Sequence, residues 1–370
     1  MTINGTEDND RVFMKMALAE AVKARGRTSP NPLVGAVIVR DGKVVGRGYH
    51  KRAGTPHAEV NAIQNAGDKA CGAEIYVTLE PCNHQGRTPP CTRAVLEAGL
   101  RRVIIGMSDP NPGVAGGGAA YLQSQGLAVS TGILEDECRK INRPFIKLVT
   151  EGVPWVIMKA GLSLDGRIAA VHGRPGWITN EKSRRFTHRL RDQADAILVG
   201  IGTALSDDPS LTARLPGAGH QDPLRVVLDS SLRLPPAARM LTQQSTAGTL
   251  VFCAVGVEAG RKEPLLAAGA EIVELPTAGQ GQPDLRFMLK ELGRRGISSL
   301  LVEGGSKIHA SFLSQGLVDQ ANLFYGPLFM GGDAVPLAGP LGLGSVDEAP
   351  RLREVNCRRF GNDVMIEGIF

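Results

Sequence analysis

The chain has 370 residues, which exceeds the usual size of one domain and predicts two domains, each able to bury its own core. Hydrophobic residues make up 42% and charged residues 21% of the chain, as in globular proteins, and no apolar run is long enough to cross a bilayer. The net charge of +5 comes without a dense basic block and aromatic residues are only 4%, which argues against a nucleic-acid partner and agrees with small anionic ligands.

The start of the chain and its cysteines predict a cytoplasmic protein. Glu7, Asp8 and Asp10 stand where a signal peptide would need a basic segment and then an apolar one. Six cysteines in so long a chain do not make a disulfide framework. In a cytoplasmic protein, a close pair of cysteines indicates metal binding or catalysis instead.

In the first half of the chain, apolar β-branched runs alternate with helical patterns, which predicts a layered α/β domain. Helices are predicted over residues 12–23, from His57, over 91–98 and up to Leu148, and strands over 33–39, 43–48, 75–79 and 103–107. Gly152 and Pro154 then interrupt the pattern. We therefore predict a first domain of residues 1–150 and a second domain of residues 151–370.

The alternation of strands and helices resumes in the second half. Strands are predicted over residues 155–160, 196–199, 224–228, 249–253 and 298–302, with helices between several of them. This pattern again predicts an α/β domain. The two halves share no repeat of fixed period, so they are not copies of each other.

A histidine and a glutamate stand together at the start of one predicted helix. Thr55 is expected to cap this helix and Pro56 fits its first turn, so the imidazole of His57 is free to face a cleft. Glu59 follows two positions later. A carboxylate at this position can act as a base toward whatever the histidine holds.

Two cysteines complete a predicted metal site. Cys82 follows the strand predicted over 75–79, at the end where open α/β sheets bind ligands, and Cys91 opens the next helix, whose dipole favours a thiolate. One imidazole and two thiolates leave a position of tetrahedral Zn²⁺ open for water, which is typical of catalytic zinc. Glu59 would take a proton from that water and pass it to a ring nitrogen and a departing amine. Zinc-dependent nucleobase deaminases carry this signature with a closer cysteine spacing.

Other interpretations of these residues remain open. Each residue alone fits a surface histidine, a solvated glutamate or a buried thiol. A structural zinc site would need a fourth ligand, which His84 could supply. The eight residues between the cysteines predict a loop over the site, in which His84 can bind substrate and Arg87 can bind a carboxylate or phosphate. Either residue alone would also fit a solvated turn.

Glycine-rich turns follow two predicted strands of the second half. Residues 200–202 read Gly-Ile-Gly, but Leu205 stands where a dinucleotide-binding loop needs its third glycine. Residues 303–306 read Glu-Gly-Gly-Ser and can hold a phosphate on free backbone amides at the start of a helix. A tight turn between strand and helix is the alternative for these residues.

Further motifs extend over both halves of the chain. They lie at 30–32 (Pro-Asn-Pro), 57–59 (His-Ala-Glu), 81–82 with 86–91, 109–112 (Asp-Pro-Asn-Pro), 159–167, 177–179, 207–212 and 303–305. On these motifs the chain closely resembles the family of bifunctional deaminase/reductases of riboflavin biosynthesis. The resemblance covers nearly the whole chain.

The resemblance implies a cytidine-deaminase-like three-layer α/β domain followed by a dihydrofolate-reductase-like α/β domain. It implies Zn²⁺ in the first domain and NADPH in the second. The implied substrate is 2,5-diamino-6-(5-phosphoribosylamino)pyrimidin-4(3H)-one, which is deaminated by water before its ribosyl chain is reduced to ribityl. The expected partner is this small phosphorylated pyrimidine, and because an intermediate passes between two sites we expect a homo-oligomer, a dimer or a tetramer.

The family also implies residues that bind the substrate of the deaminase. These are Asn31, His50, His84, Arg87, Asp109 and Asn111. From the residues alone, Asn31 and Asn111 would fit equally well as turn residues beside their prolines. Gly117 stands where related chains usually have a basic residue, so a phosphate contact at that position is left open.

In the second half, the family implies two further groups of residues. Those around NADPH are Gly161, Trp177, Thr203, Asp207, Gly304, Gly305, Ser306 and Lys307. Those facing the substrate of the reductase are Lys159, Arg191, Leu211, Arg214 and Glu303. The proton that accompanies the hydride can come from Lys159, Asp207 or water, and the sequence does not choose among them.

Two other functions compete with this one. The chain would be a deaminase of nucleosides or RNA with a binding module as its second half, or a zinc-stabilised scaffold without activity. The loop at 83–90 and the lack of a basic, aromatic surface count against the first. A substitution of Glu59 tests the second.

Overall fold

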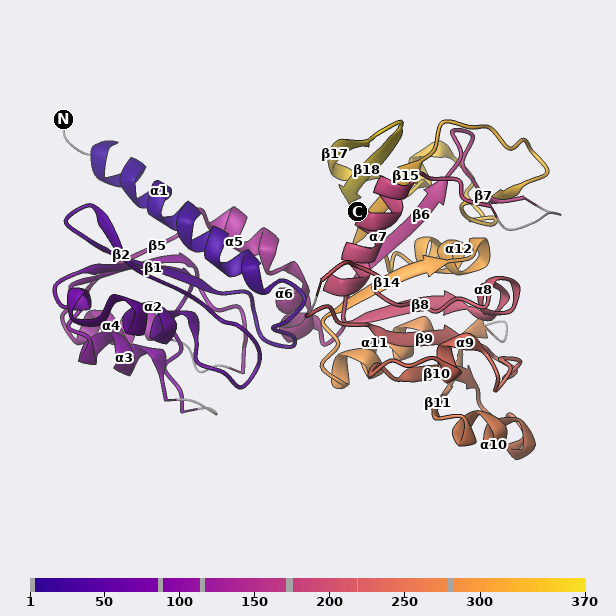
Figure 1. The fold of residues 1–370 in the computed structure, drawn as a ribbon, viewed down its shortest axis with the longest axis horizontal. Helices are drawn as coiled ribbons and strands as arrows, with labels where there is room; N and C mark the ends of the chain where they lie inside the picture. Colours follow the sequence, from indigo (N-terminus) through magenta and orange to yellow (C-terminus); the bar gives the residue numbers. More distant parts are fainter. Residues whose placement is uncertain (1–3, 86–88, 114–116, 171–175, 218, 279–281) are drawn as a thin grey trace. The chain divides into compact units, whose positions relative to one another are not determined.

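The structure, a computed structural model, describes residues 4–85, 89–113, 117–170, 176–217, 219–278 and 282–370. The chain divides into two compact units between Gly152 and Val153 (Figure 1). Both units are α/β, and each is described by itself. In the described ranges, no helix combines the length and the apolar character that crossing a membrane requires.

Unit 1 is built on a five-stranded sheet with the strand order β2-β1-β3-β4-β5. Its strands are β1 (Gly35–Arg40), β2 (Lys43–Tyr49), β3 (Glu74–Leu79), β4 (Arg102–Met107) and β5 (Ala128–Thr131). β1 runs antiparallel to β2 and β3, whereas β3, β4 and β5 are parallel. The carboxyl ends of β3 and β4 therefore meet at one edge of the sheet, where α/β sheets bind ligands.

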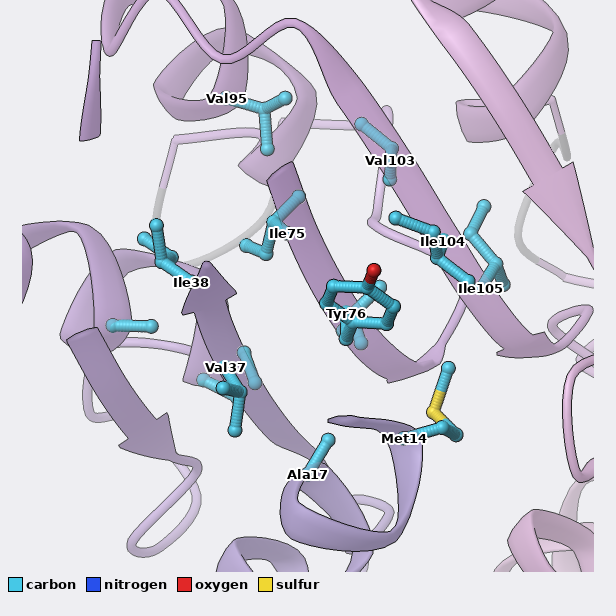
Figure 2. Close-up of a cluster of buried hydrophobic side chains, with 14 of the residues drawn as sticks. Met14, Ala17, Val37, Ile38, Ile75, Tyr76, Val95, Val103, Ile104 and Ile105 are labelled. Atoms are coloured by element: carbon cyan, nitrogen blue, oxygen red, sulfur yellow. The ribbon is translucent and has the colours of Figure 1, made fainter. Parts of the chain in front are cut away.

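Helices cover both faces of this sheet and give unit 1 three layers. They are α1 (Asn4–Ala21), α2 (Ala58–Ala66), α3 (Cys91–Glu97), α4 (Gly118–Ser124), α5 (Glu135–Ile141) and α6 (Arg143–Glu151). Figure 1 shows α1 and α5 over one face and α2, α3 and α4 over the other. Because both faces are covered, the inner strands are apolar almost without interruption, as Figure 2 shows for Ile75 and for 103–105.

Glycines let two helices lie directly on the strands. A Cβ at Gly35 of β1 would come 2.0 Å from the carbonyl oxygen of Ala17 in α1. A Cβ at Gly48 of β2 would come 2.3 Å from the amide nitrogen of Ala62 in α2. The backbone of α2 is therefore held against β2, which fixes the position of the helix start beside His57.

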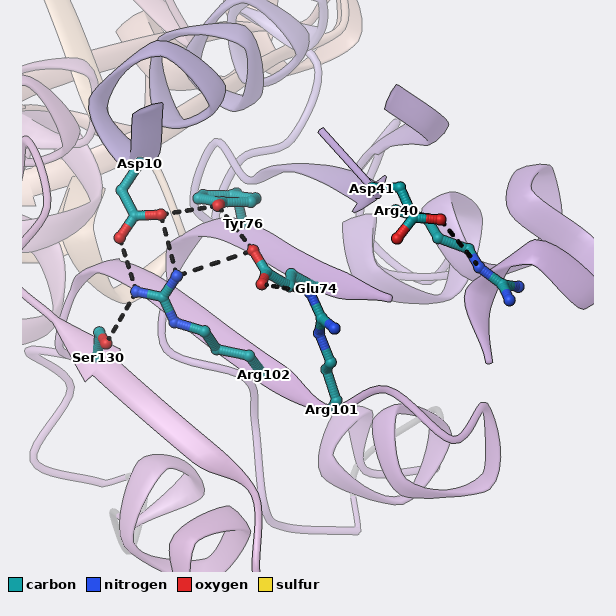
Figure 3. A network of polar contacts seen from close by, with 8 residues as sticks. All are labelled: Asp10, Arg40, Asp41, Glu74, Tyr76, Arg101, Arg102 and Ser130. Carbon is teal, nitrogen blue, oxygen red and sulfur yellow. Dashed lines mark hydrogen bonds and ion pairs between the residues drawn. The ribbon is translucent and has the colours of Figure 1, made fainter. Parts of the chain in front are cut away.

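A network of charged and polar groups connects α1 to the sheet (Figure 3). Arg102 of β4 donates to both carboxylate oxygens of Asp10 in α1, at 3.1 and 2.6 Å. The Tyr76 hydroxyl donates to Asp10 at 2.7 Å and lies 3.0 Å from the carboxylate of Glu74. Asp10 is buried, and its negative charge is compensated by this bidentate arginine.

Unit 2 is built on a nine-stranded sheet with the order β11-β10-β9-β8-β14-β6-β15-β18-β17. These strands are β6 (Trp155–Leu162), β8 (Ala196–Gly200), β9 (Leu224–Leu228), β10 (Thr249–Ala254), β11 (Ala270–Leu275), β14 (Ser299–Gly304), β15 (Gln320–Tyr325), β17 (Arg353–Phe360) and β18 (Asp363–Ile369). Neighbouring strands from β11 to β15 are parallel, and β18 and β17 complete the sheet as an antiparallel pair. This order differs from that of the dinucleotide-binding fold, which agrees with the missing third glycine at Leu205.

Two hydrophobic clusters lie on opposite faces of this sheet. The helices of the unit are α7 (Glu181–Gln193), α8 (Ile201–Asp207), α9 (Arg239–Thr242), α10 (Ala259–Ala267), α11 (Leu285–Arg294) and α12 (Ser306–Ser314). In β10, Leu250 and Phe252 pack with α11 and α12, whereas Val251 and Cys253 pack with the cluster that includes α8, α9 and α10. The unit is therefore a three-layer α/β structure.

Most of the strands predicted from the sequence are present, and two local expectations are wrong. The strand predicted over 224–228 is β9, and that predicted over 249–253 is β10. Helix α1 begins at Asn4, eight residues before the predicted start at Val12. The side chain of Thr55 does not cap α2, because its hydroxyl donates to the Arg52 carbonyl at 2.7 Å and His57 itself is the N-cap residue.

We predict that Gly35→Ala destabilises unit 1 by about 2 kcal/mol or more, because the new methyl group would meet the backbone of α1. Hydrogen exchange followed by mass spectrometry should show a loss of protection of about 30-fold in β1, β3 and β4, with unit 2 unchanged. Gly260→Ala is the control, since a Cβ there has open space around it. Unchanged exchange in Gly35→Ala would contradict the close packing of α1 on β1.

Candidate functional site

A cavity of about 360 Å³ opens at the carboxyl ends of β3 and β4 in unit 1. Most of the residues predicted for the deaminase line it. They are Asn31, His50, His57, Glu59, Cys82, His84, Asp109 and Asn111. Cys91 is buried, with its sulfur close to His57 and Cys82. The structure therefore brings together residues from five separate loops and helix starts.

Three atoms that could bind a metal ion converge beside this cavity. The ligand atoms of His57, Cys82 and Cys91 lie within 4.8 Å of one another. His57 Nδ1 is 3.1 Å from Cys91 Sγ and 3.6 Å from Cys82 Sγ, so the imidazole faces the sulfurs with Nδ1. His57 precedes α2, Cys82 follows β3 and Cys91 is the first residue of α3.

The two sulfurs are arranged for one of them to be a thiolate. The Cys91 thiol and the Cys91 amide both donate to Cys82, which lowers the pKa of Cys82 to about 4. The same hydrogen bond and burial raise the pKa of the Cys91 thiol. His57 has a raised pKa, chiefly because of its hydrogen bond with Cys82. A dication bound between these groups would replace the protons for which they compete.

The donor set fits zinc with a position left for water. Sulfur and imidazole ligands are those that Zn²⁺ prefers, and three protein ligands are typical of its catalytic sites. Among the described residues, the cluster of mutually close ligand atoms contains His57, Cys82 and Cys91 without His84. This geometry argues against the closed structural site in which His84 would be a fourth ligand.

Glu59 lies in the first turn of α2 and is only 3% exposed. Burial raises the pKa of its carboxyl group, and the neighbouring charge of His57 opposes this rise. A buried carboxyl group next to three candidate metal ligands, on the cavity wall, has the position and the proton affinity that proton transfer requires.

Asn31 and His50 form a pair on the cavity wall. The amide Nδ2 of Asn31 lies 3.1 Å from His50 Nε2, and His50 Nδ1 lies 3.4 Å from the Pro56 carbonyl oxygen. Burial lowers the pKa of His50, so a neutral ring that donates from Nδ1 and accepts at Nε2 accounts for both contacts. This contact orients the Asn31 amide.

The loop after β4 presents Asp109 and Asn111 to the cavity. Asp109 accepts from the Asn111 amide at 2.9 Å, and the Asn111 side chain accepts from the Gly113 amide at 2.9 Å. Both side chains therefore also stabilise the turn, and burial raises the pKa of Asp109. Gly117 has φ +99°, a conformation that a basic residue would rarely adopt. Arg87 lies outside the described residues.

Glu80 is a cavity residue that the sequence reasoning missed. Its Oε2 accepts from the Asp109 amide at 3.3 Å and its Oε1 accepts from the Ala119 amide of α4 at 2.9 Å. The residue stands two positions before Cys82, so its carboxylate ties the ligand segment to the loop of Asp109. The sequence Glu-Pro-Cys could have indicated Glu80, but the hydrogen-bond partners of Glu80 are 29 and 39 residues away in the chain.

Asn142 and Phe145, at the end of unit 1, were missed for the same reason. The buried Asn142 side chain accepts from the Leu33 amide at 2.8 Å and donates to the Leu33 carbonyl at 3.0 Å, which holds the loop that carries Asn31. Phe145 of α6 adds an aromatic ring to the cavity wall. The last helix of unit 1 is therefore part of the site.

In unit 2, a buried ion cluster joins three of the predicted residues. Arg191 of α7 donates to both oxygens of Glu303 at 2.7 and 2.9 Å, and Lys159 Nζ lies 3.7 Å from Glu303. Burial opposes the ionisation of Glu303, but Arg191 and Lys159 outweigh it and lower the pKa to about 2. Burial also lowers the pKa of Lys159.

Leu211 and Arg214 lie on the segment beside this cluster. Arg191 donates to the Thr212 carbonyl at 3.2 Å, which places the segment next to the guanidinium. Leu211 has φ +54° and its side chain is 2% exposed within the apolar core. Only the backbone of Leu211 is therefore available to a ligand, whereas Arg214 is exposed.

The residues predicted for NADPH gather in part. Gly304 and Gly305 have φ values of +129° and +81° between β14 and α12, and a Cβ at Gly305 would lie 3.1 Å from Thr203 Oγ1. Ser306 and Lys307 begin α12. Gly161 lies near Thr179, Trp177 is 75% exposed with Arg184 stacked on its ring, and Asp207 ends α8. None of these contacts joins Gly161, Trp177 or Asp207 directly to Gly304.

The two units match two family models. Residues 7–107 match the cytidine and deoxycytidylate deaminase zinc-binding region, and residues 154–366 match the RibD C-terminal domain. The fold and the site thus define an enzyme that combines a deaminase of the zinc-binding type with a reductase.

Relatives match both units at once. The riboflavin biosynthesis protein RibD of Aquifex aeolicus is 41% identical over 96% of this chain and 97% of its own, and that of Escherichia coli is 40% identical over 96% and 98%. Acinetobacter baumannii RibD has a TM-score of 0.88 at 34% identity, covering 98% of this chain and 99% of its own. A Thermotoga maritima deaminase/reductase has a TM-score of 0.86 at 36% identity, with coverages of 98% and 99%. The chain belongs to the RibD family of bifunctional enzymes of riboflavin biosynthesis.

We predict that Glu80→Gln lowers deaminase kcat/KM about tenfold while zinc content stays unchanged. The Glu80 carboxylate accepts hydrogen bonds from two backbone N–H groups. In the variant, the NH₂ group of glutamine would face one of these N–H groups and that bond would be lost, which loosens the loop of Asp109. Glu97→Gln on the exposed surface of α3 is the matched control and should keep full activity. Equal activity in both variants would show that Glu80 does not position the loop.

We also predict that Glu303→Gln destabilises unit 2 by about 3 kcal/mol at neutral pH, because Lys159 and Arg191 lose their counter-ion. Because Glu303 has a lower pKa in the folded chain than in the unfolded chain, it stabilises unit 2 fully above the ordinary glutamate pKa of about 4.3. This stabilisation is lost as the pH falls toward 2. Urea unfolding from pH 7 to pH 3 should therefore show the two proteins converging in acid. Glu181→Gln, at an exposed ion pair of α7, should unfold like the unchanged protein at every pH.

Proposed function

We propose that residues 1–150 remove the pyrimidine amine of 2,5-diamino-6-(5-phosphoribosylamino)pyrimidin-4(3H)-one and that residues 151–370 then reduce the ribosyl chain of the product to ribityl with NADPH. The observation that carries the proposal is the convergence of His57, Cys82 and Cys91 beside the buried Glu59 in one cavity. The Thermotoga maritima relative supports the choice of substrate, because it is a diaminohydroxyphosphoribosylaminopyrimidine deaminase and 5-amino-6-(5-phosphoribosylamino)uracil reductase.

In the proposed deamination, His57, Cys82 and Cys91 hold zinc and Glu59 moves the protons. Zinc bound there would supply hydroxide near neutral pH by lowering the pKa of its water. Glu59 would accept the proton of the attacking water and deliver it to the ring nitrogen next to the attacked carbon, and the proton of the hydroxyl group added to that carbon would reach the departing amine through the same carboxyl group. Water is added and ammonia leaves, so the atoms balance.

The cavity wall is proposed to bind the pyrimidine and its sugar. The carbonyl oxygen of Asn31, oriented by His50, is suited to accept a hydrogen bond from an amino group of the ring. Asp109 and Asn111, on the loop after β4, are suited to the ribose hydroxyls. His84 on the cavity wall and the sequence-predicted Arg87 would bind the phosphate.

In the proposed reduction, Lys159, Arg191, Glu303, Arg214 and the backbone of Leu211 bind the substrate. NADPH would supply the hydride, held by Gly161, Trp177, Thr203, Asp207, Gly304, Gly305, Ser306 and Lys307. The exocyclic nitrogen or the sugar ring oxygen that gains a proton can take it from Lys159, because the lowered pKa of this buried ammonium favours proton release. Glu303 opposes this release, but burial outweighs it.

We predict that Glu59→Gln lowers ammonia release from the diaminopyrimidinone phosphate roughly 1,000-fold, since the Glu59 carboxyl group, which interacts with His57 and Cys91, is the proposed carrier of both protons. Zinc content should stay at one ion per chain, and NADPH oxidation with the already deaminated substrate should be unchanged. The control Glu97→Gln should behave as the unchanged protein. Ammonia release that survives in Glu59→Gln would contradict the proposed role of Glu59, and its absence in the unchanged protein would refute the proposed function.

A further inference from the structure

His188 and Arg191 lie one turn apart on α7 and contact the same stretch of backbone, residues 212–214. His188 Nδ1 is 3.3 Å from the Thr212 carbonyl oxygen and 3.3 Å from the Arg214 amide nitrogen. Arg191 Nη1 donates to the same Thr212 carbonyl at 3.2 Å. The amide between these two contacts, that of Ala213, donates to Asp222 at 2.8 Å. Side chains therefore hold each residue of this stretch by its backbone.

One nitrogen of His188 serves two backbone groups, and only one can be bonded at a time. With a proton on Nδ1 the ring donates to Thr212, and with Nδ1 bare it accepts from the Arg214 amide. Burial, followed by the charges of Arg191 and Arg214, lowers the pKa of His188. The neutral ring that results can make either bond, and each bond ties the backbone of residues 212–214 to α7.

The stretch that His188 holds is built to receive an anion. Burial lowers the pKa of the Arg214 guanidinium, and the charges of Arg191 and Arg239 lower it further, so an anion bound beside Arg214 would be stabilised. The preceding residue, Leu211, has a left-handed backbone that leucine rarely adopts. Such conformations persist only where the surroundings hold them in place, and they concentrate at ligand sites.

We propose that His188 is a positioning residue of the reductase, which holds residues 212–214 so that Arg214 meets the phosphomonoester of the substrate. The inference rests on the proposed function of unit 2. His188 itself need not touch the substrate, because its contacts are with the backbone on which Arg214 stands.

The test is the reductase reaction of the full chain with saturating NADPH and the deaminated, phosphorylated substrate. His188→Leu should raise KM about three- to tenfold, as the loss of one hydrogen bond implies, with kcat changed less than twofold. The inhibition constant of inorganic phosphate should rise by the same factor. Zinc content and ammonia release in unit 1 should stay unchanged.

Two polar variants separate positioning from simple packing. The amide of asparagine reaches the place of Nδ1, so His188→Asn should restore most of the KM. The amide of glutamine reaches the place of Nε2, so His188→Gln should resemble the leucine variant. A soluble glutamine variant keeps the test valid if the leucine variant fails to fold.

His220→Leu is the matched control, because His220 contacts the same loop at the Pro216 carbonyl and should leave KM unchanged. A KM that is unchanged in His188→Leu and His188→Gln, or one that rises equally in His220→Leu, would overturn the role of His188. If the unchanged protein does not oxidise NADPH with this substrate, the proposed function itself fails, which is a distinct result.

Discussion

The site of unit 1 depends on one constraint: the imidazole of His57 and the sulfurs of Cys82 and Cys91 must be held within 4.8 Å of one another, where they share hydrogen bonds. His57 Nδ1 is 3.1 Å from Cys91 Sγ, and the Cys91 amide donates to Cys82 Sγ. Gly48 makes this possible by letting α2 lie on β2, and the end of β3 brings Cys82 to the start of α3. A dication is the partner that such a group of donors favours.

The surrounding residues are arranged around this centre by contacts of their own. Glu80 ties the loop of Asp109 to the segment of Cys82, and Asn142 ties the loop of Asn31 to the last helices of the unit. The ligands and the cavity walls are therefore held by the same few hydrogen bonds. In unit 2, ion pairs hold the candidate site together, because Arg191, Lys159 and Glu303 form a buried cluster.

The sequence was sufficient for residues whose chemistry is legible over a short span. Inner strands such as β9 and β10 appeared as apolar runs, and His57, Cys82 and Cys91 stood in a recognisable pattern. It was insufficient where polar strands form, as in β17, whose side chains are almost all exposed and show no apolar period. It also misled at Thr55, whose hydroxyl has a nearer acceptor at Arg52 than the helix it was expected to cap.

The roles of residues whose partners are far away in the chain could not be predicted from the sequence. Glu80 binds amides 29 and 39 residues away, and Asn142 binds Leu33 across 109 residues. Such contacts exist only once the sheet is formed. Leu211 is a related case. Its side chain belongs to the core, and nothing in a leucine predicts the left-handed backbone conformation that this residue adopts.

X-ray absorption at the zinc edge of the purified full chain tests the central claim most directly. The account predicts one zinc per chain with two sulfurs at about 2.3 Å, one nitrogen at about 2.0 Å and one oxygen from water at a similar distance. A second imidazole in place of that water, as His84 would provide, or a chain that binds no zinc would contradict it.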